Sequence, residues 1–245
     1  MPDMWSELFP LLAGGVAVFV GAVVQGGVGF GLGLMASPLI AITNPDAMPG
    51  AVQVVNATLP LFTLAVEWRG VDWKGLGFAV LGRLPGSVIG AVVVVYVSTR
   101  ALGVLVGVMV VIAVVLTARA PAVPRNGKTI ASAGFLSGIT GTATGIGGPP
   151  MALVYQSARG TQVRATLAFF FLFGALQSLG ILAVVGKLPA RALGIGAALI
   201  PFMILGFAVS GPLRRRLDGG RLRVAVLTVA AVSACTLIGQ SLARW

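Results

Sequence analysis

The sequence predicts an all-α integral membrane protein, and three observations lead to this prediction. Hydrophobic residues make up 57% of the 245 positions, charged residues only 9%, and the mean hydropathy is +1.01. Apolar stretches long enough to cross a hydrocarbon core of about 30 Å recur from end to end. Nearly all Lys and Arg residues lie in the short gaps between these stretches. Because so few polar groups cannot coat a soluble globule, we expect lipid to surround most of the chain.

Eight apolar segments follow one another along the chain, at residues 8–43, 47–66, 75–97, 101–118, 129–157, 164–185, 191–213 and 222–243. Six of them have the length of a single spanning helix. The first and the fifth are longer, and glycines interrupt them at 26–33 (GGVGFGLG) and 141–150 (GTATGIGGPP). Since Gly and Pro weaken a helix by about 1 and 3 kcal/mol relative to Ala, we expect neither segment to cross as one straight helix.

The positions of Lys and Arg distinguish two topologies for these segments. If all eight cross once, as two parallel repeats, each side receives eight basic residues and no orientation is favoured. If the first and fifth are re-entrant hairpins, one side receives only four, namely Arg100, Lys187, Arg191 and Arg244. The other side receives twelve, namely Arg69, Lys74, Arg119, Arg125, Lys128, Arg159, Arg164, Arg214, Arg215, Arg216, Arg221 and Arg223. This bias favours the hairpins and places both termini outside.

An internal repeat supports the same division of the chain. A shift of 116 residues superposes the two glycine interruptions without a gap and pairs Gly29 with Gly145 and Met35 with Met151. The sequence therefore predicts a first half at 1–118, a linker at 119–128 and a second half at 129–245. In this fold the halves are two inverted repeats, each a Gly-broken re-entrant hairpin plus three transmembrane helices.

The composition excludes most catalytic chemistry. The chain contains no His, a single Cys and six acidic residues, so it lacks the groups for a zinc site, a Ser-His-Asp triad or a disulfide. We therefore expect no enzyme activity, no metal and no cofactor. The net charge of +11 fits orientation against an anionic leaflet rather than nucleic-acid binding. The acidic start of the chain lacks the basic region of a signal peptide, so we expect the first segment to remain in the mature protein.

The glycine interruptions predict a site for an anionic ligand. Backbone N–H groups freed inside a membrane must find protein, water or a ligand, and the helix that resumes points its positive end at the same place. Two such helix starts, near Gly31–Leu34 and Gly148–Met151, would face each other at mid-bilayer. Pro149 and Pro150 suit the first turn of a helix. The alternative is that these glycines only allow helices to pack closely.

Arg83 is the strongest single candidate for binding a substrate. It lies about nine residues inside the third segment, with no Asp or Glu at membrane depth to pair with it. Its fork of donors suits sulfite, a sulfonate or a carboxylate. The alternatives are snorkelling to the interface and bonding of carbonyls freed at Pro85. We expect Glu67 to be an interface charge beside Trp68 and Arg69.

The polar side chains and glycines around the interruptions complete the predicted site. Hydroxyls and amides can donate to an oxyanion, although a single Ser or Thr often bonds its own helix backbone instead. Gln53, Asn56 and Thr63 share one face of the second segment and either line a path or join helices. The predicted substrate-binding residues are Arg83, Gln25, Gly27, Gly29, Gly31, Ser37, Asn56, Thr140, Thr142, Thr144, Gly145, Gly147, Gly148 and Gln177.

Three motifs carry a resemblance to a known family. GGVGFGLGLMASPL at 26–39, GRLPGSVIG at 82–90 and GITGTATGIGGPPMALVY at 138–155 resemble the sulfite exporter TauE/SafE family over nearly the full length. The resemblance implies a multi-pass secondary transporter that exports small anions, sulfur-containing or carboxylate, across the bacterial inner membrane. An anion uptake carrier or channel, or a membrane scaffold without transport activity, are the alternatives. The expected partners are a small anionic substrate and the lipid bilayer, and the Gly-rich faces could also serve a homodimer.

Overall fold

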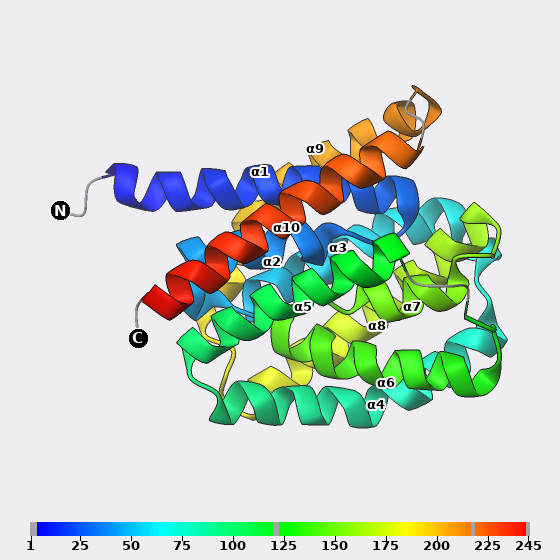
Figure 1. Cartoon of the computed structure of the whole chain (residues 1–245), viewed down its shortest axis with the longest axis horizontal. Coiled ribbons are helices and arrows are strands. Elements are labelled where there is room, and N and C mark those ends of the chain that lie inside the picture. Colours follow the sequence, from blue (N-terminus) through cyan, green and yellow to red (C-terminus); the bar gives the residue numbers. More distant parts are fainter. Residues whose placement is uncertain (1–3, 120–122, 217–218, 244–245) are drawn as a thin grey trace.

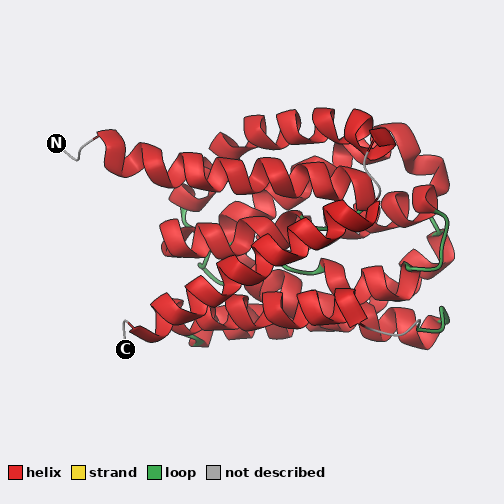
Figure 2. Ribbon diagram, turned by 45° about the horizontal axis from the view of Figure 1, so that its top comes forward, coloured by secondary structure: helices red, strands yellow, loops and turns green. Residues whose placement is uncertain are grey.

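The structure is a computed structural model that describes residues 4–119, 123–216 and 219–243, and these residues form helices and no strand (Figures 1 and 2). The helices in chain order are α1 (Met4–Val28), α2 (Leu32–Thr43), α3 (Gly50–Glu67), α4 (Trp73–Tyr96), α5 (Thr99–Arg119), α6 (Gly127–Thr144), α7 (Gly148–Tyr155), α8 (Gly160–Val184), α9 (Ala190–Arg216) and α10 (Gly219–Ala243). Short 3-10 turns cover Pro45–Ala47 and Trp68–Gly70.

The all-helical membrane fold predicted from the sequence is confirmed. In the described part of the chain, six helices are long and apolar enough to cross a membrane. Each of the predicted apolar segments forms one helix, except that the two glycine-interrupted segments form the pairs α1/α2 and α6/α7. The predicted linker at 119–128 covers the last residue of α5, the connection to α6 and the first two residues of α6, and residues 120–122 of it lie outside the described residues.

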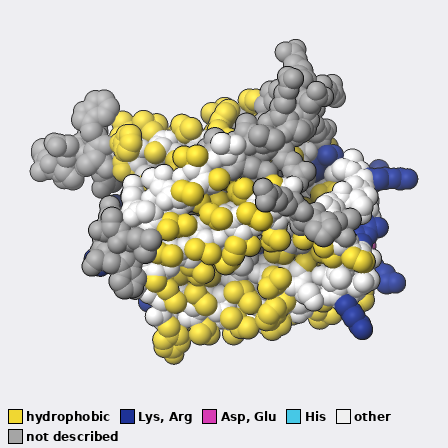
Figure 3. Space-filling model, in the orientation of Figure 1, with side chains coloured by type: hydrophobic (Ala, Val, Ile, Leu, Met, Phe, Trp, Pro, Cys, Tyr) yellow, Lys and Arg dark blue, Asp and Glu magenta, His cyan; other side chains and the backbone are white. Residues whose placement is uncertain are grey.

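The helices pack as four main pairs. α4 packs on α6, α1 on α9, α3 on α8, and α5 on α10. α1 begins and α10 ends at the same end of the molecule (Figure 1). The connections α3–α4, α5–α6 and α7–α8 lie at the opposite end (Figure 1), and Arg69, Lys74, Arg125, Lys128 and Arg159 are exposed on or beside them. We call this the basic end. Figure 3 shows Lys and Arg gathered there, with apolar side chains covering the face between the two ends.

Close packing of α4 on α6 depends on glycine. A Cβ added at Gly82 or Gly86 of α4 would meet the carbonyl oxygen of Ala131 or Phe135 of α6, and one added at Gly134 would meet that of Ala79. The two backbones therefore touch, as small residues allow in lipid. Some glycines of this chain thus serve helix packing, which was the alternative interpretation of the glycine-rich sequence.

The interruptions require glycine for a different reason. Gly29 and Gly31, between α1 and α2, have φ values of +101° and +135°, and Gly145, after α6, has a φ of +78°. These values lie in the left-handed region, which residues with a Cβ rarely adopt. A Cβ at Gly33 would meet the carbonyl oxygen of Gly145, so the two interruptions are in direct contact. The fold thus brings together two chain breaks that lie over a hundred residues apart.

Candidate functional site

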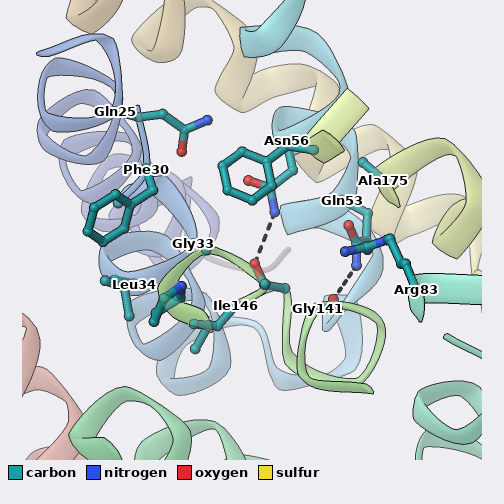
Figure 4. Close-up of a pocket in the computed structure, with 16 residues that line it drawn as sticks. Gln25, Phe30, Gly33, Leu34, Gln53, Asn56, Arg83, Gly141, Ile146 and Ala175 are labelled. Carbon is teal, nitrogen blue, oxygen red and sulfur yellow. Dashed lines mark hydrogen bonds between the residues drawn. The ribbon is translucent and has the colours of Figure 1, made fainter. Parts of the chain in front are cut away.

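A small cavity of about 30 Å³ lies where the two interruptions meet (Figure 4). Its volume has room for one or two water molecules. Its walls come from both halves of the chain, at Gln25, Phe30, Gly31, Gly33, Leu34, Gln53, Asn56, Arg83, Gly141, Gly145, Ile146, Gly147, Gly148, Pro149, Phe171 and Ala175. We call it the central cavity.

Arg83 supplies the positive charge of the central cavity. Its side chain is only 3% exposed, although it belongs to a helix apolar enough to span a membrane. Nη1 donates to the carbonyl oxygen of Ser137 over 3.3 Å, and Cζ lies 5.0 Å from the ring centroid of Phe170. Nε is buried and has no hydrogen-bond partner. In the described residues no carboxylate forms an ion pair with this guanidinium.

Two amides of α3 fix the second interruption. Gln53 Nε2 donates to the carbonyl oxygen of Gly141 over 2.6 Å, and Asn56 Nδ2 donates to that of Gly145 over 3.0 Å (Figure 4). The Gly141 carbonyl also accepts from the backbone N–H of Gly145 over 2.9 Å, whereas the Gly145 carbonyl lies just beyond α6, where no intrahelical donor follows. The first half of the chain thereby holds the broken helix of the second half in place.

A third amide fixes the first interruption. Gln25 of α1 is 5% exposed, and its Oε1 accepts from the backbone N–H of Leu32, the first residue of α2, over 3.1 Å. With the oxygen engaged, the amide nitrogen remains as a donor, and Figure 4 shows the side chain pointing into the space that faces Asn56. Gln25 therefore orders the start of α2 and offers a donor to the central cavity.

The two helix starts differ in what they present to the central cavity. α2 begins with Leu32, Gly33 and Leu34, which all carry a backbone N–H, and that of Leu32 already donates to Gln25. α7 begins with Gly148 followed by two prolines, which have no N–H. The contribution of α7 is therefore mainly the positive end of its dipole, whereas α2 adds hydrogen-bond donors.

The structure gathers half of the predicted site residues around the central cavity and places the rest elsewhere. Those that line it are Gln25, Gly31, Asn56, Arg83, Gly145, Gly147 and Gly148. Gly27 lines a second cavity, and a Cβ at Gly29 would lie 3.2 Å from the Cα of Arg164. The Oγ of Ser37 is buried without a hydrogen-bond partner, and this residue does not line the central cavity.

The remaining predicted residues bond other parts of the protein. Thr140 and Thr144 donate to the carbonyl oxygens of Leu136 and Thr140 in their own helix. Thr142 bonds the Ser178 hydroxyl over 2.8 Å, and Gln177 accepts from Ser87 over 3.1 Å. These hydroxyls and the Gln177 amide join helices or satisfy their own backbone.

Several cavity residues were not selected from the sequence. Gln53 was predicted only to line a path or join helices, and its place beside Arg83 follows from the packing of α3 on α8 and from its hydrogen bond to the Gly141 carbonyl of α6. The others are mostly apolar or glycine: Phe30, Gly33, Leu34, Gly141, Ile146, Pro149, Phe171 and Ala175. Phe30, Gly33 and Leu34 belong to the first motif, and Gly141, Ile146 and Pro149 belong to the second, so the two motifs were the available signals. Phe171 and Ala175 share a face of α8 at a spacing of four residues, but nothing in the sequence says what that face meets.

A second, larger cavity of about 440 Å³ adjoins the central cavity. The two share Phe30, Gly31, Leu34 and Pro149 as walls. The larger cavity reaches the α7–α8 connection at the basic end, where its walls include Gly160 and Arg164. We call it the vestibule. Arg164 forms an ion pair with Glu67, with 2.6 Å between Nη2 and Oε1. Glu67, which was expected to be an interface charge beside Trp68, thus joins the end of α3 to α8.

The comparisons with known proteins identify the family of this chain. The family model for the sulfite exporter TauE/SafE matches residues 13–237. A curated relative from Cupriavidus necator, named probable sulfite/organosulfonate exporter TauE, is 26% identical over 213 residues, which cover 81% of this chain and 82% of the relative. The solved structures contain no significant match. Since the family model spans most of the chain, this multi-pass membrane protein belongs to the sulfite exporter TauE/SafE family of membrane transporters.

Proposed function

We propose that this transporter exports small anions across the bacterial inner membrane, and that the anion binds in the central cavity against Arg83. Sulfite, thiosulfate and organosulfonates are the expected substrates, followed by small carboxylates. The observation that carries the proposal is the Arg83 guanidinium, buried at membrane depth with Nε unbonded and with no carboxylate paired to it in the described residues. The name of the Cupriavidus necator relative is consistent with this substrate class.

The energetics of a buried guanidinium support an anionic ligand. An arginine near the bilayer centre costs at least about 2.5–3.5 kcal/mol, and charges that remain buried are normally paired. Among the described residues, the Ser137 carbonyl is the hydrogen-bond partner of the charge and the Phe170 ring is its cation–π partner. An oxyanion would supply the missing counter-charge, accept from Nε, and face the positive ends of α2 and α7.

We also propose that the two halves are inverted repeats, whose movement opens the central cavity alternately to the two sides of the membrane. The shift of 116 residues converts α4 and α6 into the positions of α9 and α1, and both of these pairs pack together. The same shift exchanges α3 with α8 and α5 with α10, which also form pairs. This is the packing expected if a pseudo-two-fold axis relates the halves.

The vestibule gives the proposed route between the cytoplasm and the central cavity. It lies between the central cavity and the basic end, and the positive-inside rule assigns that end to the cytoplasm. An anion entering from the cytoplasm would then meet Phe30 and Leu34 before it reaches Arg83. An uptake carrier or a channel would use the same site, so the direction of flux from loaded vesicles distinguishes these functions.

Thermal stability of the purified protein against a panel of anions tests the binding site. A ligand at a hundred times its Kd adds about 2.7 kcal/mol to the stability of the folded state. Sulfite, thiosulfate or an organosulfonate should raise the Tm of the parent protein, and this rise should disappear in Arg83→Ala. Arg69→Ala removes an exposed arginine at the basic end and should keep the full response. A normal response in Arg83→Ala would rule out the proposed site, whereas no response of the parent protein to any anion would rule out the substrate class.

A further inference from the structure

Arg83 lies in a narrow slot between two helices. On the α8 side it meets Phe170 and, one turn later, Gly174, and a Cβ added at Gly174 would overlap Cζ and Nε of the guanidinium. On the other side a Cβ at Gly141 of α6 would lie 3.1 Å from Nη2, and one at Gly147, in the interruption after α6, would lie 3.3 Å from Nη1. The guanidinium is thus enclosed by three positions that carry no side chain.

Gly174 imposes the strictest limit of the three. The contacts at Gly141 and Gly147 would require shifts of a few tenths of an ångström, whereas the overlap at Gly174 leaves no room for the guanidinium in its present place. The atoms that a Cβ at position 174 would displace belong to the end of the flexible Arg83 side chain and not to the backbone. By contrast, a Cβ at Gly138 would lie 2.6 Å from the backbone oxygen of Arg83, so substitution there would separate two helices.

We infer that Gly174 is a positioning residue for anion binding, because its missing side chain is the space that holds the Arg83 guanidinium beside the central cavity. This inference rests on the proposed function. A methyl group at position 174 displaces the guanidinium toward the open space that it already lines, which is the central cavity of about 30 Å³. The displaced group then occupies the place of the anion. The substitution therefore acts on binding and leaves the helix packing intact.

Sulfite binding to the purified full-length protein tests this role. Gly174→Ala should weaken the Kd for sulfite by about tenfold or more, the loss expected when a charged hydrogen bond is removed. Gly180→Ala is the matched control, since Gly180 is an exposed glycine of the same helix with no atom within 4 Å of an added Cβ. It should bind sulfite as the parent protein does. Normal sulfite binding in Gly174→Ala, together with lost binding in Arg83→Ala, would overturn the inference and leave the proposed function standing.

The double variant Arg83→Ala with Gly174→Ala separates positioning from a general packing defect. Without the guanidinium the methyl group enters vacated space, so the Tm of the double variant should equal or exceed that of Arg83→Ala alone. This non-additivity is the expected sign of direct contact between the two positions. If Gly174→Ala alone does not fold, recovery of folding in the double variant supports the inference, and failure of the double variant to fold overturns it. If Arg83→Ala retains its sulfite response, the proposed function fails first.

Discussion

Gly145 shows how a single residue ends α6 and shapes the site. Its φ of +78° costs a residue with a Cβ about 1–2 kcal/mol, and an added Cβ would lie 2.6 Å from Cγ1 of Val52. Gly145→Ala should therefore lower the free energy of unfolding by about 2 kcal/mol or more, measured by denaturation in detergent. Gly27→Ala is the control within α1, where an added Cβ meets no atom within 4 Å. A neutral Gly145→Ala would show that the left-handed turn is not needed.

Gln25 allows binding and folding to be separated at one position. Gln25→Glu keeps an acceptor for the backbone N–H of Leu32 and places a negative charge across the cavity from Arg83. We expect this variant to fold but to lose the Tm increase caused by sulfite, because the carboxylate competes with the anion for the guanidinium. Gln25→Leu leaves the buried Leu32 N–H unpaired and should cost about 1–3 kcal/mol of stability. A sulfite response of normal size in Gln25→Glu would place the anion elsewhere.

The residues of the central cavity differ in how far the sequence could identify them. Arg83 could be selected because a charge inside an apolar segment is costly and usually faces a cavity or a partner. Thr140 and Thr144 lie at the second interruption in the sequence, yet their hydroxyls donate to carbonyl oxygens of their own helix. A hydroxyl has both options in any helix, so sequence alone cannot separate them. Gln53 reaches the site only through the tertiary packing of α3.

At the scale of elements, helix boundaries could be predicted better than helix partners. The apolar segments end at glycines, prolines and charges, which fix where α1, α2, α6 and α7 begin and end. The pairing of α4 with α6 could not be predicted, because a helix in lipid is apolar on all faces and its periodicity does not identify the buried side. Gly82 and Gly86 are four residues apart, but Gly77 of the same helix faces open space.

The α4–α6 pairing leads to a prediction for one helix. Gly86→Ala places a methyl group against the backbone carbonyl oxygen of Phe135. The contact can be relieved only if the backbones of α4 and α6 move apart. Overpacking of this kind costs about 1–3 kcal/mol, so the Tm should fall clearly below that of the parent protein. Gly77→Ala lies on the same helix with no atom within 4 Å of the added Cβ and should be neutral. Equal Tm values for the two variants would mean that α4 and α6 are not in backbone contact.

At the scale of the whole molecule, the arrangement of the halves in the membrane is the largest open prediction. The two topologies weighed from the sequence place the basic residues on different sides of the membrane. Three exposed residues distinguish them: Arg100, Lys128 and Lys187. If the first and fifth segments are re-entrant, Arg100 and Lys187 share one side and Lys128 lies on the other. If all eight segments cross once, Lys128 and Lys187 share a side and Arg100 lies opposite. A homodimer through the Gly-rich faces also remains a prediction.

Labelling of single cysteines decides between these topologies. Cys235, on α10, is first replaced by Ser, and Cys is then introduced in place of Arg100, Lys128 or Lys187. A membrane-impermeant maleimide added to intact spheroplasts should label Arg100→Cys and Lys187→Cys but not Lys128→Cys, because the basic end faces the cytoplasm. Inside-out vesicles should give the reverse pattern. Joint labelling of Lys128→Cys and Lys187→Cys would instead support eight single crossings, and the proposal of inverted repeats with a shared central cavity would have to be abandoned.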